Sequence, residues 1–144
     1  MTTEEKLREK SAHYLPCFVN ECPKHQTCLH WLTGQHTVKT GINIMTVNPM
    51  NPDVKAGRCE LYRENLTVKY VRGMMNFFDE MTSRQEKNIR HRLISLYSRK
   101  IYYEYRNGVR PINPQIQQQI ARICQQEGYT AEPRYDAWEE DFLW

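Results

Sequence analysis

The segment from residue 83 to residue 128 constrains the fold most, because it combines helical periodicity with recognisable start and stop signals. Its apolar residues recur at three- and four-residue spacing, which is typical of helices that bury one face. Ser98 can divide the first part of this pattern, since a serine favours the start of a new helix. We therefore predict one helix over residues 84–96 and a second over residues 99–106.

A third helix is predicted after a short turn. The pair Asn107-Gly108 is a typical helix stop, and Pro111 blocks any continuation of the second helix. Asn113 can then cap a new helix whose first position is Pro114, and Gly128 ends it. Three helices joined by short turns must pack closely together.

The rest of the chain is expected to follow a mostly α fold. The stretch "TVKYVRGMMNFFDEM" also has helical spacing, and a short charged helix is expected over residues 3–13. One short strand is expected from Ile42 to Val47. We predict a single domain over residues 1–144, with an irregular cysteine-bearing region at 14–65, a helical region at 66–128 and an acidic aromatic tail at 129–144.

Length and composition place the chain among ordinary globular proteins. It has 144 residues, of which 40% are hydrophobic, and this is enough for one buried core. No apolar run is long enough to span a bilayer, and the charged start "MTTEEKLREK" lacks the apolar centre of a signal peptide. We expect a cytoplasmic protein without a membrane partner.

The net charge is only +3, but the charges are unevenly distributed. Residues 84–110 contain eight Lys or Arg against two Glu, whereas residues 127–144 contain six acids against one Arg. The basic segment is either a face that binds polyanions, a helix covered by the acidic tail, or a solvated surface. The tail "YDAWEEDFLW" can dock into a partner protein or fold back. Folding back is expected, because its aromatic rings would otherwise expose apolar area.

The order of helix, tight turn, short helix and supporting helix is that of a helix-turn-helix DNA-binding unit. In this interpretation "SRKIYYEYRNG" is the helix that enters the groove. The core-facing residues are Ile101, Tyr102 and Tyr105. The predicted nucleic-acid-binding residues are Arg99, Lys100 and Tyr103 near the start of the helix, with Arg106 and Arg110 on the phosphates.

The segment "SRKIYYEYRNGVRPINPQIQQQIARICQQEGY" resembles the DNA-binding headpiece of the lactose-repressor family. Both have a Ser opening the reading helix, an Asn-Gly closing it, a Pro-bearing cap and a third helix ending in "EGY". The turn before the reading helix departs from that pattern, because "SLYS" stands where the family carries a Gly. The alternative is a plain helical hairpin with buried tyrosines and solvated arginines.

Four cysteines in the N-terminal half have a spacing that suits a metal site. The run "CFVNECPKHQTC" is followed thirty residues later by a fourth cysteine, and an irregular region gains stability from a bound metal. The predicted ligands are Cys17, Cys22, Cys28 and Cys59. His25 and His30 can replace a cysteine. Zinc is expected, with an iron–sulfur cluster, free thiols or a redox role as alternatives, and Cys124 is expected in the core.

The whole chain also resembles a family of small bacterial cysteine-motif proteins of unknown function. The resemblance rests on the early cysteine run, a later single Cys, the segment "YYxYRxG" and a final "GY…YDxW…W". No catalytic residues are predicted, since no oxyanion or phosphate loop accompanies the cysteine–histidine cluster. The sequence predicts a nucleic-acid-binding, regulatory protein with a structural metal. The alternative is a metal-stabilised protein–protein interaction module without nucleic-acid binding or catalysis.

Overall fold

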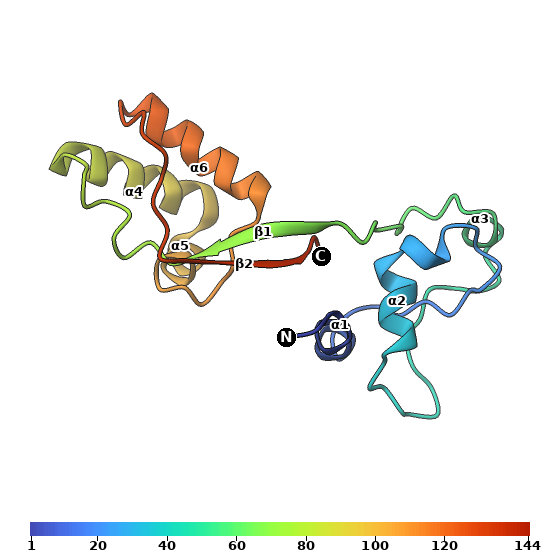
Figure 1. The fold of residues 1–144 in the computed structure, drawn as a ribbon. Helices are drawn as coiled ribbons and strands as arrows, with labels where there is room; N and C mark the ends of the chain where they lie inside the picture. The colour runs from blue at the N-terminus through green and yellow to red at the C-terminus, as the bar shows by residue number, and fades with distance from the viewer. The chain divides into compact units, whose positions relative to one another are not determined.

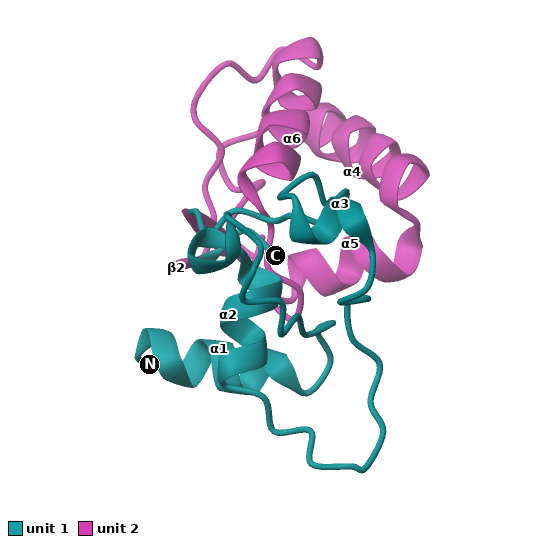
Figure 2. Ribbon diagram, turned by 90° about the vertical axis from the view of Figure 1, so that its right-hand side faces the viewer, with its two compact units in different colours: residues 1–66, 142–144 teal, residues 67–141 magenta.

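The computed structural model describes residues 1–144 and contains six α-helices and a two-stranded antiparallel sheet (Figure 1). The chain divides into two compact units (Figure 2): unit 1 is Met1–Leu66 with Phe142–Trp144, and unit 2 is Thr67–Asp141. In chain order the elements are α1 (Thr3–Ser11), the 3₁₀ turn η1 (His25–Thr27), α2 (Leu29–Gln35), α3 (Pro52–Lys55), β1 (Thr67–Arg72), α4 (Ser83–Tyr97), α5 (Arg99–Arg106), α6 (Pro114–Gln126) and β2 (Ala137–Phe142). No helix combines the length and the apolar character needed to cross a bilayer.

The prediction of a mostly α fold is wrong, because the stretch that begins at Thr67 forms strand β1 instead of a helix. Strand β1 pairs with β2 from the end of the chain (Figure 1). On its other side, the amide of Val71 donates to the carbonyl of Ile112 at 3.1 Å, and the amide of Ile112 donates back at 2.8 Å. Valine and tyrosine favour such a pleated, half-buried position. Pairing with remote segments therefore overrides the helical spacing.

The three predicted helices of unit 2 are confirmed as α4, α5 and α6. A capping box of Thr82 and Gln85 starts α4, and Asn113 caps α6 ahead of Pro114. Together with β1 and the loop after it, these helices enclose one core. Its most buried side chains are Met74, Phe77, Ile89, Leu93, Tyr102, Ile112, Ile120 and Cys124.

The junction between α4 and α5 is a single residue, Ser98, which confirms the predicted break. Ser98 has φ 84° and ψ 158° and is the only non-glycine residue with positive φ. Its hydroxyl accepts a hydrogen bond from the amide of Ile101 at 3.3 Å and so caps α5. This backbone region is essentially restricted to glycine, and another residue there is strained by about 1–3 kcal/mol.

Replacing Ser98 with Gly should therefore raise the free energy of unfolding by about 1 kcal/mol. Glycine adopts this backbone conformation without strain. The strain energy that the substitution removes is larger than the two losses that oppose it, which are the few tenths of a kcal/mol contributed by the Ser98 cap and the greater conformational entropy that glycine gives the unfolded chain. Urea denaturation followed by circular dichroism measures the change. In the control, Ser95→Gly on the exposed side of α4 should lower stability by about 0.5 kcal/mol. A destabilised Ser98→Gly variant would contradict the positive φ.

Unit 1 is less regular, although it contains α1, η1, α2 and α3. Two small apolar clusters hold it together. The predicted strand from Ile42 to Val47 is absent. In this segment the amide of Val47 donates a backbone hydrogen bond to the carbonyl of Pro16 at 3.0 Å. The side chains of Ile42 and Met45 are exposed. A strand needs a partner for its amides and carbonyls, and no neighbouring strand faces this segment.

The acidic tail folds back as expected, but it contains strand β2 and does not cover the basic helix. Glu139 forms an ion pair with Arg72 on β1 at 2.9 Å. Trp138 lies over the ammonium group of Lys69 at 4.8 Å and remains 61% exposed. Further on, Phe142 is buried in unit 1 with Leu7 and Leu29, with Trp144 packed against that cluster.

Candidate cysteine pocket and basic helix

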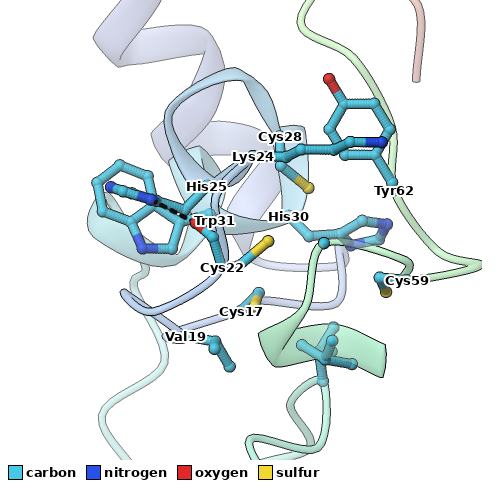
Figure 3. A pocket seen from close by; sticks show the side chains of 13 residues that line it. Cys17, Val19, Cys22, Lys24, His25, Cys28, His30, Trp31, Cys59 and Tyr62 are labelled. Atoms are coloured by element: carbon cyan, nitrogen blue, oxygen red, sulfur yellow. Dashed lines mark hydrogen bonds between the residues drawn. The ribbon is translucent and has the colours of Figure 1, made fainter. Parts of the chain in front are cut away.

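The four cysteines predicted as metal ligands line one small pocket in unit 1 (Figure 3). The pocket has a volume of about 20 Å³, which is room for a single water-sized sphere or ion. The side chains of His25 and His30 also line it. The structure therefore brings together six sulfur and nitrogen donors that come from positions 17 to 59 of the chain.

Local backbone structure positions three of the four cysteines. The amide of Cys17 donates to the carbonyl of His30 at 2.9 Å, which ties the first cysteine to α2. Cys28 is the residue before α2 and forms an isolated antiparallel bridge with Glu64. Cys59 follows α3, and its carbonyl accepts a hydrogen bond from the amide of Tyr62 at 3.1 Å. Three separate chain segments thus meet at the pocket.

Gly57 lets the chain after α3 approach the pocket closely. It has φ +78°, and an added Cβ would lie 2.7 Å from Cγ of Pro23. Both facts favour glycine over any other residue at this position. The close approach brings the turn that carries Cys59 next to the segment that carries Cys22.

Both histidines have the same tautomer, because the ring atom Nδ1 of each lies against a backbone carbonyl. Nδ1 of His25 is 2.7 Å from the carbonyl oxygen of Cys22, a hydrogen bond visible in Figure 3. Nδ1 of His30 is 2.7 Å from the carbonyl oxygen of Leu15. A carbonyl can only accept, so Nδ1 donates and Nε2 keeps its lone pair in the neutral ring. This is the usual arrangement of histidines that bind metals.

The thiols are mostly buried, and their surroundings change the acidity of Cys17. Cys17, Cys22 and Cys28 are buried, while Cys59 is partly exposed. Burial raises the pKa of the Cys17 thiol, and Cys28, Cys22 and Cys59 raise that pKa further. In these side-chain rotamers, however, no three ligands converge closely enough to coordinate one ion.

The predicted nucleic-acid-binding residues lie on α5 and in the turn after it. Arg99 and Lys100 are exposed, and Tyr103 is partly exposed. The guanidinium group of Arg99 lies 5.9 Å from the ring centre of Tyr103, so these two side chains form one surface. On the opposite side of α5, Tyr102 and Tyr105 are buried as predicted.

The two arginines expected on phosphates differ in their surroundings. Arg106 lies on α5 and is partly exposed. Arg110 forms a hydrogen-bonded ion pair with Glu104 at 2.6 Å. This pairing reduces the net charge that Arg110 offers to an anion. Sequence patterns do not indicate the pair, because the turn at Gly108 brings the two residues together.

Sequence reasoning missed several residues at the mouth of the cysteine pocket. Trp31 packs edge-on against the ring of His25 at 4.6 Å. The ammonium group of Lys24 lies 4.8 Å from the ring centre of Tyr62. Only the fold of unit 1 brings these residues to the cysteines. Lys24 is, however, close in sequence to Cys22 and Cys28, which is a weak signal for it.

Comparison with known proteins adds a family but no activity. No curated protein and no solved structure matches the chain. The model of one protein family matches residues 1–144, which is the whole chain. The expectation of a family without an assigned function is confirmed, whereas the repressor resemblance stays a prediction. The chain belongs to the Family of unknown function (DUF6078).

Proposed function

We propose that this chain is a small nucleic-acid-binding protein, regulatory and cytoplasmic, that reads duplex DNA through α5. The observation that supports this most is the break at Ser98, which separates α5 from α4 and exposes the beginning of α5. A helix-turn-helix unit needs such a break, because its second helix must enter the major groove with its N-terminal residues. Buried Tyr102 and Tyr105 anchor the other side of the helix in the core of unit 2.

The charge on α5 favours an anionic partner. Arg99 and Lys100 are exposed, and neither takes part in an ion pair. Two acidic residues of the tail are occupied elsewhere, since Glu139 pairs with Arg72 on β1 and Asp136 accepts the amides of Met75 and Asn76. The two cations near the start of α5 are therefore available for phosphates or base edges, and phosphate contacts supply most of the affinity in such complexes.

Binding to duplex DNA at several salt concentrations tests this proposal. Fluorescence anisotropy with a labelled duplex of random sequence should give an affinity that falls as salt rises. Arg106→Ala should reduce the slope of log affinity against log salt by about 1, because one phosphate contact is lost. Arg110→Ala should reduce it less, since its charge is already paired. The matched control is Arg122→Ala on α6, which removes an exposed charge far along the chain and should leave the slope unchanged.

Sequence preference distinguishes the reading helix from general attraction to phosphate. Selection from a random duplex pool should enrich related sequences for the unmodified chain. Arg99→Ala or Lys100→Ala should change the enriched sequences, because these side chains would reach base edges. Equal binding by the control and α5 variants would assign the affinity to net charge. No binding at low salt would reject the proposal.

A protein partner is the second candidate. Its support is the segment after α2, where Val38, Ile42, Met45 and Met50 expose large apolar side chains. Exposed apolar side chains can mark protein interaction sites when they form a continuous patch, and these four fall within thirteen residues of sequence. A chain that fails to bind any nucleic acid at low salt would favour this interaction module. The same exposed residues would then be the first to replace with serine.

A further inference from the structure

We propose that the cysteine pocket of unit 1 binds one zinc ion through the thiolates of Cys17, Cys22, Cys28 and Cys59. The four thiols line a single pocket although they are spread over forty-three residues of sequence. This site goes beyond nucleic-acid binding by α5, since all of its donors belong to unit 1. Its test is therefore independent of that function.

The donors select the metal. Among the side chains that line the pocket, those that commonly bind metals are the four thiols and two imidazoles, and no carboxylate lines it. Sulfur and nitrogen donors suit zinc, whereas calcium and magnesium require oxygen ligands. The volume of about 20 Å³ has room for a single ion, whereas an iron–sulfur cluster of several atoms would need more space than these rotamers leave. A single tetrahedral zinc fits this combination of donors and space.

Coordination requires the ligand side chains to move inside the pocket. The sulfur atoms do not converge on one point in the present rotamers. Rotation about χ1 moves a cysteine sulfur between staggered positions without moving the backbone. Each thiol releases its proton when it becomes a ligand, so zinc binding depends on pH.

His30 is the neighbour that supports the site. Its ring stacks on Tyr14 with ring centres 4.5 Å apart, and its Nδ1 donates to the carbonyl of Leu15. These two contacts hold the ring in place and leave the lone pair of Nε2 free, and His30 lines the pocket. His30 can therefore take the place of Cys59, the only partly exposed thiol of the four, as a fourth ligand.

The experiment measures metal directly in the full chain. Elemental analysis of chain purified without chelator should find about one zinc per chain. Titration of reduced, metal-free chain with Co²⁺ should give the absorption of a tetrahedral thiolate complex. Cys22→Ser and Cys28→Ser should each weaken Co²⁺ binding by more than about 100-fold, which exceeds the loss caused by residues outside the ligand set. Cys59→Ser should weaken it less if His30 replaces the lost sulfur, and the double change with His30→Ala should then abolish binding.

Cys124→Ala is the matched control, because this thiol is buried in the core of unit 2. It should keep one zinc and an unchanged Co²⁺ spectrum. A second measurement needs no variant: a thiol reagent should modify Cys17, Cys22, Cys28 and Cys59 more slowly with zinc than without it. A folded, reduced wild-type chain that carries no zinc, shows no Co²⁺ spectrum and gains no thiol protection would overturn the proposal.

Discussion

Deleting residues 136–144 should lower the free energy of unfolding by at least about 3 kcal/mol, the cost of truncating a large core side chain. The deletion removes strand β2 from unit 2 and takes Phe142 from the cluster that it forms with Leu7 and Leu29 in unit 1. It also removes Asp136, whose carboxylate accepts the amide of Met75 at 3.0 Å. Urea denaturation, followed by circular dichroism and tryptophan fluorescence, measures the loss.

Two single substitutions identify which part of the tail matters. Phe142→Ala should cost about 3 kcal/mol, because this ring is 9% exposed. Trp138→Ala is the matched aromatic control. It should cost less than about 1 kcal/mol, since its ring is 61% exposed and contacts one lysine. If the shortened chain unfolds at the same urea concentration as the full chain, the tail is free and is better interpreted as a partner-binding peptide.

Replacing Gly73 with Ala should destabilise unit 2 by about 3 kcal/mol. Gly73 follows β1 with φ +80°, a conformation that costs another residue about 1–2 kcal/mol. The new Cβ would also overlap the side chain of Asp136, lying 2.9 Å from its Cβ. Moving Asp136 breaks its hydrogen bonds to the amides of Met75 and Asn76, which costs roughly 1–2 kcal/mol more.

Gly41→Ala provides the comparison for this prediction. Gly41 lies in the exposed segment after α2, and an added Cβ there would come no closer than 3.4 Å to another atom. Its substitution should change the free energy of unfolding by less than about 0.5 kcal/mol. Equal stabilities for the two variants would show that the contact of Gly73 with Asp136 does not exist in solution.

The helical part of unit 2 was predictable because its signals are local. The cap at Asn113, the stop at Asn107-Gly108 and the break at Ser98 each depend on residues within one helical turn. In the structure these three signals correspond to the start of α6, the end of α5 and the junction between α4 and α5. The inward position of Tyr102 follows from the same short-range spacing.

The sheet was not predictable from spacing. Strand β1 begins at Thr67 and pairs with β2, which begins at Ala137. The 64 residues between the two strands carry no signal that these segments pair, because hydrogen bonds between strands depend on spatial and not sequential distance. The helical spacing of Val71, Met74 and Phe78 was therefore misleading. Val71 is in the strand and the other two lie in the loop that follows it.

Ile101, predicted to face inward, and Tyr103, predicted to face outward, are both partly buried against the core of unit 2. The sequence did predict the three helices within residues 83–126, the burial of Tyr102 and Tyr105, and the exposure of Arg99 and Lys100. These depend on residue type and on contacts within a few residues. The sequence did not predict the ion-sized pocket between the four cysteines, the pairing of Arg110 with Glu104, or the strand that the tail forms on β1. The pocket and the strand pair each depend on closing a loop between segments far apart in the chain, and local sequence does not encode which closure buries the most apolar surface. The ion pair joins residues only six positions apart, and the turn at Gly108 brings them together.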